Sequence, residues 1–174
     1  MTNRPFPWRT LVAGQIALGL LAVTTVVQMP TRLVWNASAS VPIGLYAIRP
    51  VERLALAELV LAQPPAPIAE FLADGGYVGN GVPLLKRIAA LSGQTVCREG
   101  LEVTVDGAAL VTARERDRAG RPLPHWSGCR TITESEVFLV NRDEPASLDG
   151  RYFGPLPTSS IVGRATPVWT GRER

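Results

Sequence analysis

The sequence has few histidines and cysteines, the residues that most often bind metals in enzymes. Among its 174 residues there is one histidine, His125, and there are two cysteines, which lie in separate segments. A zinc site needs three or four such ligands, so we expect no metal and no cofactor. The G-x-S-x-G sequence of a nucleophile elbow is absent as well. A Ser-His-Asp triad built on His125 is an alternative, but a lone histidine in a Pro-rich stretch is more often a surface residue.

Lysine is equally scarce. Of the 18 basic residues, 17 are arginine, and the single lysine is Lys86, inside the apolar run from Pro83 to Leu91. Arginine is always charged, whereas a desolvated lysine loses its proton near neutral pH. Lys86 is therefore a candidate general base, although the survival of one lysine by chance is the alternative.

The net charge of +3 does not indicate a nucleic-acid partner. The densest group of arginines, between residues 114 and 121, alternates with Glu115 and Asp117 and has few aromatic neighbours. This pattern is typical of a solvated loop of mixed charge. We therefore predict no binding to nucleic acid.

Long apolar runs are absent beyond the first thirty residues, but residues 10–29 form one without any charged side chain. At ~1.5 Å per residue such a helix spans ~30 Å, the thickness of the hydrocarbon core of a bilayer. Pro30 would end it, and Trp8 and Trp35 flank it as interfacial anchors. We expect a single transmembrane helix over residues 10–29.

The basic residues near this run predict its orientation. Arg4 and Arg9 precede it and only Arg32 closely follows it, which favours a cytoplasmic segment at 1–9 and an extracytoplasmic domain at 30–174. A cleaved signal peptide is the alternative, because Ala37-Ser38-Ala39 resembles a cleavage site. That site lies well beyond the apolar run, and we therefore favour a retained anchor.

The two cysteines agree with export. Cys97 and Cys129 are too far apart in the sequence for a close metal-ligand spacing. In an oxidising compartment we expect them to pair and to stabilise the domain by ~3 kcal/mol. Two independent buried thiols are the alternative.

The exported part has the pattern of a mostly β domain, a twisted sandwich or partial barrel, because short apolar runs alternate with Gly and Pro turns. We expect a hairpin turn at Asp106-Gly107 and one short helix over 67–74. The predicted strands cover residues 44–48, 58–62, 84–91, 95–105, 136–140 and 161–168.

Three segments resemble the boxes of the signal peptidase I superfamily. Residues 40–46, Ser-Val-Pro-Ile-Gly-Leu-Tyr, are similar to its nucleophile box and in particular to the conjugal-transfer peptidases of the TraF type. Residues 84–96 are similar to its lysine box, and residues 147–156 resemble its aspartate signature. Gly163-Arg164 closes the pattern. The resemblance implies a signal-peptidase-like β domain behind a single transmembrane helix.

The resemblance also implies roles for individual residues. Ser40 would be the nucleophile and Lys86 the base, which requires burial to lower the lysine pKa by about three units. The backbone N–H of Ser40 and the Ser38 hydroxyl would form the oxyanion site, with a plain turn residue as the alternative for Ser38. Asp149 would orient the site, unless it only forms an Asx turn, and Arg151 would brace its loop.

Two positions depart from the family pattern. Val41 stands where many members carry Met, and Gly150 replaces the Ser that often follows the aspartate. Neither change removes a catalytic group.

Taken together, the resemblance implies a serine endopeptidase in the bacterial inner membrane, with its catalytic domain in the periplasm. Its substrate would be a membrane-inserted pilin precursor of a conjugative type IV secretion system, with cyclisation of the product as an option. One alternative is a general type I signal peptidase, and another is a non-catalytic membrane-anchored subunit of a pilus or secretion apparatus. A soluble self-cleaving repressor is excluded by the anchor and by the lack of a DNA-binding half.

Overall fold

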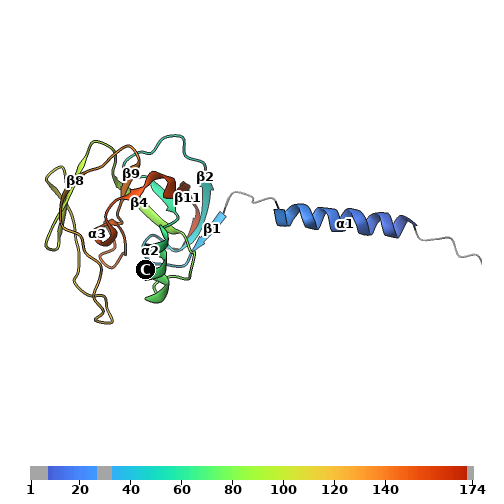
Figure 1. Ribbon diagram of the computed structural model, residues 1–174, viewed down its shortest axis with the longest axis horizontal. Helices are drawn as coiled ribbons and strands as arrows, with labels where there is room; N and C mark the ends of the chain where they lie inside the picture. The colour runs from blue at the N-terminus through green and yellow to red at the C-terminus, as the bar shows by residue number, and fades with distance from the viewer. Residues whose placement is uncertain (1–7, 27–32, 172–174) are drawn as a thin grey trace, which may run out of the picture. The chain divides into compact units, whose positions relative to one another are not determined.

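A computed structural model describes residues 8–26 and 33–171 of the chain (Figure 1). The chain divides into two units at residues 31 and 32. The described part of the first unit is one helix, α1 (Trp8–Val26). Within the described ranges, no helix combines the length and the hydropathy that a membrane crossing requires. Residues 27–29 of the predicted span lie outside these ranges.

The second unit is mostly β, as predicted, and its strands form two antiparallel sheets. The larger sheet contains, in spatial order, β1 (Leu33–Asn36), β2 (Gly44–Arg49), β11 (Ile161–Thr170), β3 (Leu59–Ala62), β4 (Leu84–Ala90), β9 (Glu136–Leu139) and β10 (Leu156–Pro157). The smaller sheet contains β7 (Ala108–Thr112), β6 (Glu102–Val105), β5 (Thr95–Glu99) and β8 (Gly128–Thr131). The helical segments are α2 (Ala66–Asp74), α3 (Gly150–Phe153) and the short 3₁₀ turn η1 (Thr158–Ser160).

Each predicted strand overlaps an observed one, but one of them is divided. The run predicted over 95–105 forms β5 and β6, because the chain turns at Gly100, whose φ is 60°. The turn predicted at Asp106-Gly107 joins β6 to β7, and both residues have positive φ, 50° and 78°, as a type I′ hairpin turn requires. The strands β1, β7, β8 and β10 were not predicted.

The alternation of side chains along β4 positions Lys86. Leu85 belongs to a core cluster that includes Tyr46, whereas Ile88 belongs to another cluster on the opposite face. Lys86 shares the face of Ile88, because successive residues of a strand point to opposite sides. Lys86 therefore extends into the interior rather than to the solvent, and only 5% of it is exposed.

The predicted pairing of the two cysteines is found in the smaller sheet. Cys97 in β5 lies directly opposite Cys129 in β8, and the two form a disulfide with a sequence separation of 32 residues. Closing a loop of this length stabilises a fold by about 3–4 kcal/mol in the chain-entropy account. The loop it closes carries β6, β7 and the segment from 113 to 127.

Candidate active site

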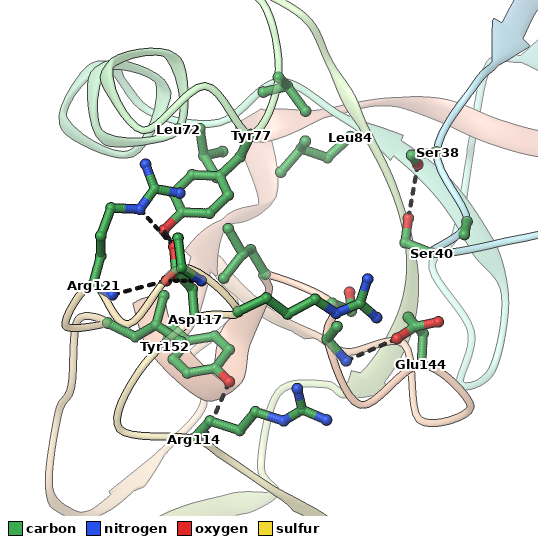
Figure 2. A pocket seen from close by; sticks show the side chains of 18 of the residues that line it. Ser38, Ser40, Leu72, Tyr77, Leu84, Arg114, Asp117, Arg121, Glu144 and Tyr152 are labelled. Atoms are coloured by element: carbon green, nitrogen blue, oxygen red, sulfur yellow. Dashed lines mark hydrogen bonds and ion pairs between the residues drawn. The ribbon is translucent and has the colours of Figure 1, made fainter.

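A cleft of about 460 Å³ brings together side chains from segments far apart in the sequence (Figure 2). Ser38 and Ser40 come from the turn between β1 and β2, and Lys86 comes from β4. Ser147 comes from the loop between β9 and α3. The sequence-predicted nucleophile and base therefore line the same cleft.

Ser40 has its hydroxyl next to that of Ser38, at 3.1 Å between the two Oγ atoms (Figure 2). The Ser38 hydroxyl donates to Asn36 Oδ1 at 2.9 Å, so its single hydrogen is used and Ser40 is the donor of the Ser pair. The backbone N–H of Ser40 has no acceptor among the described residues. This N–H is available to an oxyanion, whereas the Ser38 hydroxyl must first turn away from Asn36.

Lys86 is buried, and this burial changes its basicity. The pKa of Lys86 is lowered from 10.5 to about 8, mainly by desolvation; Asp149 and Glu144 oppose this shift, and Arg151 adds to it. Its Nζ donates a hydrogen bond to Ser147 Oγ at 2.7 Å. A substantial fraction of neutral amine is therefore present slightly above neutral pH, as a general base requires.

Ser40 and Lys86 share the cleft without bonding to each other. No hydrogen bond joins them within 33–171: Lys86 donates to Ser147, and Ser40 to Ser38. Catalytic hydrogen bonds in unliganded enzymes are often long and tighten only when substrate binds. The cleft thus contains both groups, and the hydrogen bond for proton transfer between them would form when substrate binds.

Asp149 and Arg151 form a buried ion pair behind the cleft. Arg151 Nε donates to Asp149 Oδ1 at 2.8 Å, and the exposed fractions of the two side chains are 1% and 0%. The Asp149 carboxylate also accepts from the backbone N–H of Asn141 at 3.0 Å, and Arg151 Nη2 donates to the carbonyl of Asn141 at 2.7 Å. Asp149 makes no hydrogen bond to Ser40 or Lys86 in the described residues. The pair holds the loop that presents Ser147.

With this geometry established, comparison with known proteins gives the family. The family model described as signal peptidase, peptidase S26, matches residues 7–170. The chain belongs to this signal peptidase family.

Several relatives of this family member cover nearly all of the chain. A probable conjugal transfer protein TraF of Sinorhizobium fredii is 32% identical and covers 98% of this chain and 95% of its own length. A plasmid transfer protein TraF of Escherichia coli is 32% identical over 92% and 88% of the two chains. A signal peptidase I from Enterococcus faecalis V583 covers 67% of this chain and 99% of its own, with 20% identity and a TM-score of 0.40. The recognition of the family and of its TraF-type members from the sequence is confirmed.

Two polar residues of this candidate site were not singled out from the sequence. Ser147 lay inside the third box without an assigned role, although it stands two residues before Asp149. Asn141 was missed altogether; it is 3% exposed, and its Nδ2 donates to the carbonyls of Ser40 and Leu85 at 2.8 and 3.1 Å. A polar residue directly after a buried strand was the available signal.

Asn141 connects the nucleophile turn to the strand of the base. Besides its two donated bonds, its Oδ1 accepts from the backbone N–H of Arg87 at 3.0 Å. It therefore holds the backbone on both sides of Lys86 and the carbonyl of Ser40 with one side chain. Fixing both elements through one buried amide sets the distance between the two candidate catalytic groups.

The departure at Gly150 has a steric reason. A Cβ atom at this position would lie 2.7 Å from the Phe138 ring and 2.8 Å from the carbonyl oxygen of Leu139. No side chain fits there without movement of β9, so the serine of other family members has no room in this chain.

His125 is exposed and does not line the cleft. A triad built on this histidine therefore has no geometric support from the described residues.

Proposed function

We propose that this member of the signal peptidase family is a serine endopeptidase in which Ser40 is the nucleophile and Lys86 the general base. The observation that carries the proposal is the environment of Lys86. It is the single lysine of the chain, it is 5% exposed with its pKa lowered to about 8, and it lines the cleft that Ser40 also lines. A buried amine without a carboxylate partner is costly to a fold, which supports a chemical role.

The reaction follows from these groups. The neutral Lys86 Nζ takes the proton of Ser40 Oγ as this oxygen attacks the scissile carbonyl carbon. The C–N bond then breaks, and the lysine ammonium gives the proton to the departing amine, which leaves an acyl-enzyme on Ser40. Water attacks the ester carbonyl, Lys86 takes and returns a second proton, and the acid product leaves. The Ser40 N–H and the Ser38 hydroxyl stabilise the oxyanion in both steps.

The proposed substrate is an exported, membrane-inserted precursor, in particular a conjugative pilin precursor cut beside small residues. The support is that curated relatives covering most of the chain are named conjugal or plasmid transfer proteins. If an amino group of the substrate reaches the ester before water does, the product is a closed ring. Action on many exported proteins, as in a general type I signal peptidase, is the second candidate.

The proposed location is the periplasmic face of the bacterial inner membrane, with residues 10–29 as the anchor. An exposed apolar surface on the β domain supports contact with a membrane. Trp35 and Trp169 stack at 5.7 Å between ring centroids, and 57% and 58% of these side chains are exposed. Leu33 and Val168, in the same two strands, are also 59% exposed. Exposed tryptophans beside aliphatic residues are typical of surfaces that meet a membrane interface.

The proposal is tested by precursor processing in membranes that hold a co-expressed candidate pilin. The enzymes compared are the wild type, Ser40→Ala and Lys86→Arg, with immunoblots to show equal accumulation. We expect no processing by either variant, because the first removes the nucleophile and the second keeps the charge but removes the base. Ser127→Ala, an exposed serine outside the cleft, is the matched control and should process normally.

Each outcome decides between the candidates. Processing by Ser40→Ala or Lys86→Arg at the wild-type rate rejects the Ser-Lys pair and returns the non-catalytic assembly subunit to consideration. Mass spectrometry of the product distinguishes a ring, which lacks one water, from a linear peptide. Cleavage of unrelated exported precursors in the same membranes would favour the general signal peptidase.

A further inference from the structure

The arginine-rich segment between β7 and β8, expected from the sequence to be a solvated loop, forms part of the cleft wall. Arg114, Asp117, Arg118 and Arg121 all line the cleft together with Ser40 and Lys86. Figure 2 shows Arg121, Asp117 and Tyr77 gathered on one side of this cleft and Ser38 with Ser40 on the other. The charges of this segment therefore face the space that a substrate must enter.

Asp117 holds the wall in place. Its carboxylate accepts from Tyr77 at 2.6 Å, from Arg121 Nε at 2.7 Å and from the backbone N–H groups of Ala119 and Arg121 at 2.8 and 2.9 Å. The hydrogen bond from Tyr77 is the largest cause that lowers the pKa of Asp117, so the carboxylate stays ionised. The tip of the segment is thus an exposed loop, as predicted, whose conformation is held by the bonds to Asp117.

The guanidinium of Arg121 is engaged in contacts within the wall. Besides its ion pair with Asp117, its Nη1 donates to the carbonyl of Gly75 at 2.7 Å, and its guanidinium lies 4.6 Å from the centre of the Tyr77 ring. These contacts tie the segment to the end of α2. Arg121 therefore fixes the position of the wall, and its charge is already paired with Asp117.

Arg114 and Arg118 differ from Arg121. Within residues 33–171, neither guanidinium has a hydrogen bond or an ion pair, although the backbone N–H of Arg114 is fixed by Tyr152 at 3.1 Å. Glu144 and Lys86 are the other charged residues of the cleft that make no ion pair within residues 33–171. The Glu144 carboxylate accepts from the backbone N–H of Ala146 at 2.8 Å. Both arginines thus line the cleft, and neither guanidinium is engaged by another group of residues 33–171.

We propose that Arg114 and Arg118 form a substrate subsite for a carboxylate that lies within a few residues of the scissile bond. The proposal rests on the serine endopeptidase function proposed above and adds a specificity to it. A guanidinium binds a carboxylate through two parallel N–H donors. The carboxylate is either an Asp or Glu side chain or the C-terminus of a substrate cut near its end.

The experiment uses the full chain in detergent and a panel of peptides with alanines around the expected cleavage site. Each position on either side carries Glu, Gln or Lys in turn, and each peptide is made with a free C-terminus and with a C-terminal amide. Cleavage is measured as kcat/KM by mass spectrometry. A Glu side chain as ligand gives a preference over Gln at one position, whereas a terminal carboxylate gives a preference for the free acid over the amide.

Three variants locate the preference. We expect the wild type to favour the carboxylate peptide roughly tenfold, the gain typical of one charged hydrogen-bonded pair. Arg118→Gln and Arg114→Gln should each reduce that ratio towards one, and Arg118→Glu should favour the Lys peptide. Arg116→Gln is the matched control, because Arg116 is on the same segment but does not line the cleft.

The outcomes separate this inference from the proposed function. If Ser40→Ala still cleaves the panel, the endopeptidase function is rejected. If Ser40→Ala is inactive but the wild type has no carboxylate preference, or Arg116→Gln reduces the preference as much as Arg118→Gln, only the subsite is rejected. Binding of fluorescent Glu and Gln peptides to Ser40→Ala protein gives the same comparison if the wild type cleaves too slowly to measure.

Discussion

Lys86 combines a charged group with a position that excludes water. Its 5% exposure lowers its pKa to about 8, so at pH 6 only about one molecule in a hundred has the neutral amine. We expect kcat/KM to rise about tenfold per pH unit below pH 8 and to level off above it. A pH–rate profile of peptide cleavage tests this, and a profile that is flat from pH 6 to 9 contradicts a lysine base.

The same burial predicts a cost in stability. Lys86 binds its proton with a pKa of about 8 in the folded protein and 10.5 as the ordinary value, so below pH 8 the folded state carries a penalty of up to roughly 3 kcal/mol. The penalty disappears as the pH rises from 8 to 10.5, because both states then lose the proton. Lys86→Met removes this penalty and should therefore raise the free energy of unfolding at pH 7. The loss of the hydrogen bond to Ser147 offsets part of the gain, and we expect a net increase of about 1–3 kcal/mol.

Urea denaturation of wild type and Lys86→Met at pH 7 and pH 10 measures this difference. The advantage of the methionine variant should shrink at the higher pH. An advantage that is the same at both values would mean that the burial of the charge is not its cause.

Asn141 is expected to position the catalytic groups without touching the substrate. Asn141→Ala removes the donor to the Ser40 and Leu85 carbonyls and the acceptor for Arg87, so kcat should fall by ten- to a hundredfold. KM should change little, because the amide group of Asn141 is already engaged by the backbone of Ser40, Leu85 and Arg87. Steady-state kinetics well below the unfolding temperature measure kcat and KM separately. A rise in KM as large as the fall in kcat would indicate that the substitution disrupts the site as a whole.

At the scale of elements, the packing of α3 against β9 explains why the chain departs from its family at Gly150. Gly150→Ser should destabilise the domain by about 1–3 kcal/mol, because its Cβ overlaps Phe138 and the Leu139 carbonyl. Gly171→Ser is the control, since the nearest atom to its Cβ is 3.8 Å away. Thermal unfolding compares the two, and equal melting temperatures would contradict the steric account.

Which strands could be predicted depends on their burial. β3 and β9 have apolar, buried side chains and were visible as apolar runs. All four residues of β8 are exposed, and its sequence Gly-Cys-Arg-Thr has no apolar run. The sequence of β7, Ala-Ala-Leu-Val-Thr, is apolar, but its residues are exposed or only half-buried, and the strand was missed. Backbone pairing to β5 and β6, together with the disulfide, places them instead. The divided run at 95–105 depended on a single glycine turn.

At the scale of the whole molecule, the proposed topology can be measured directly. Alkaline phosphatase fused after residue 174 should be active in a bacterial host if residues 30–174 are periplasmic, whereas a fusion before residue 10 should be inactive. Active phosphatase in both fusions, or in neither, would contradict the proposed orientation.

The exposed tryptophan pair is expected to contribute to membrane contact. Trp35→Ser with Trp169→Ser should weaken the flotation of the protein with anionic vesicles, because it removes the stacked exposed pair.

The sequence by itself determined the family and the mostly β fold of the second unit, and it favoured the pairing of the two cysteines that the structure contains. It also singled out Ser40, Lys86 and Asp149 as candidates. These conclusions rest on residue identity within short segments: the one lysine, the Ser-x-Pro box and the Leu-Asp-Gly signature are visible without any knowledge of distant contacts. Local patterns of this kind depend only on neighbouring residues and can therefore be recognised in the sequence without the structure.

Only the tertiary structure decided how these candidates are surrounded. The partner of Lys86 is 61 residues away at Ser147, and Asn141 reaches the Ser40 carbonyl across 101 residues. The arginine segment became a cleft wall because Asp117 bonds to Tyr77, 40 residues earlier. Burial, pKa and the shape of a cleft depend on which distant segments pack together, and no local pattern in the sequence encodes that packing.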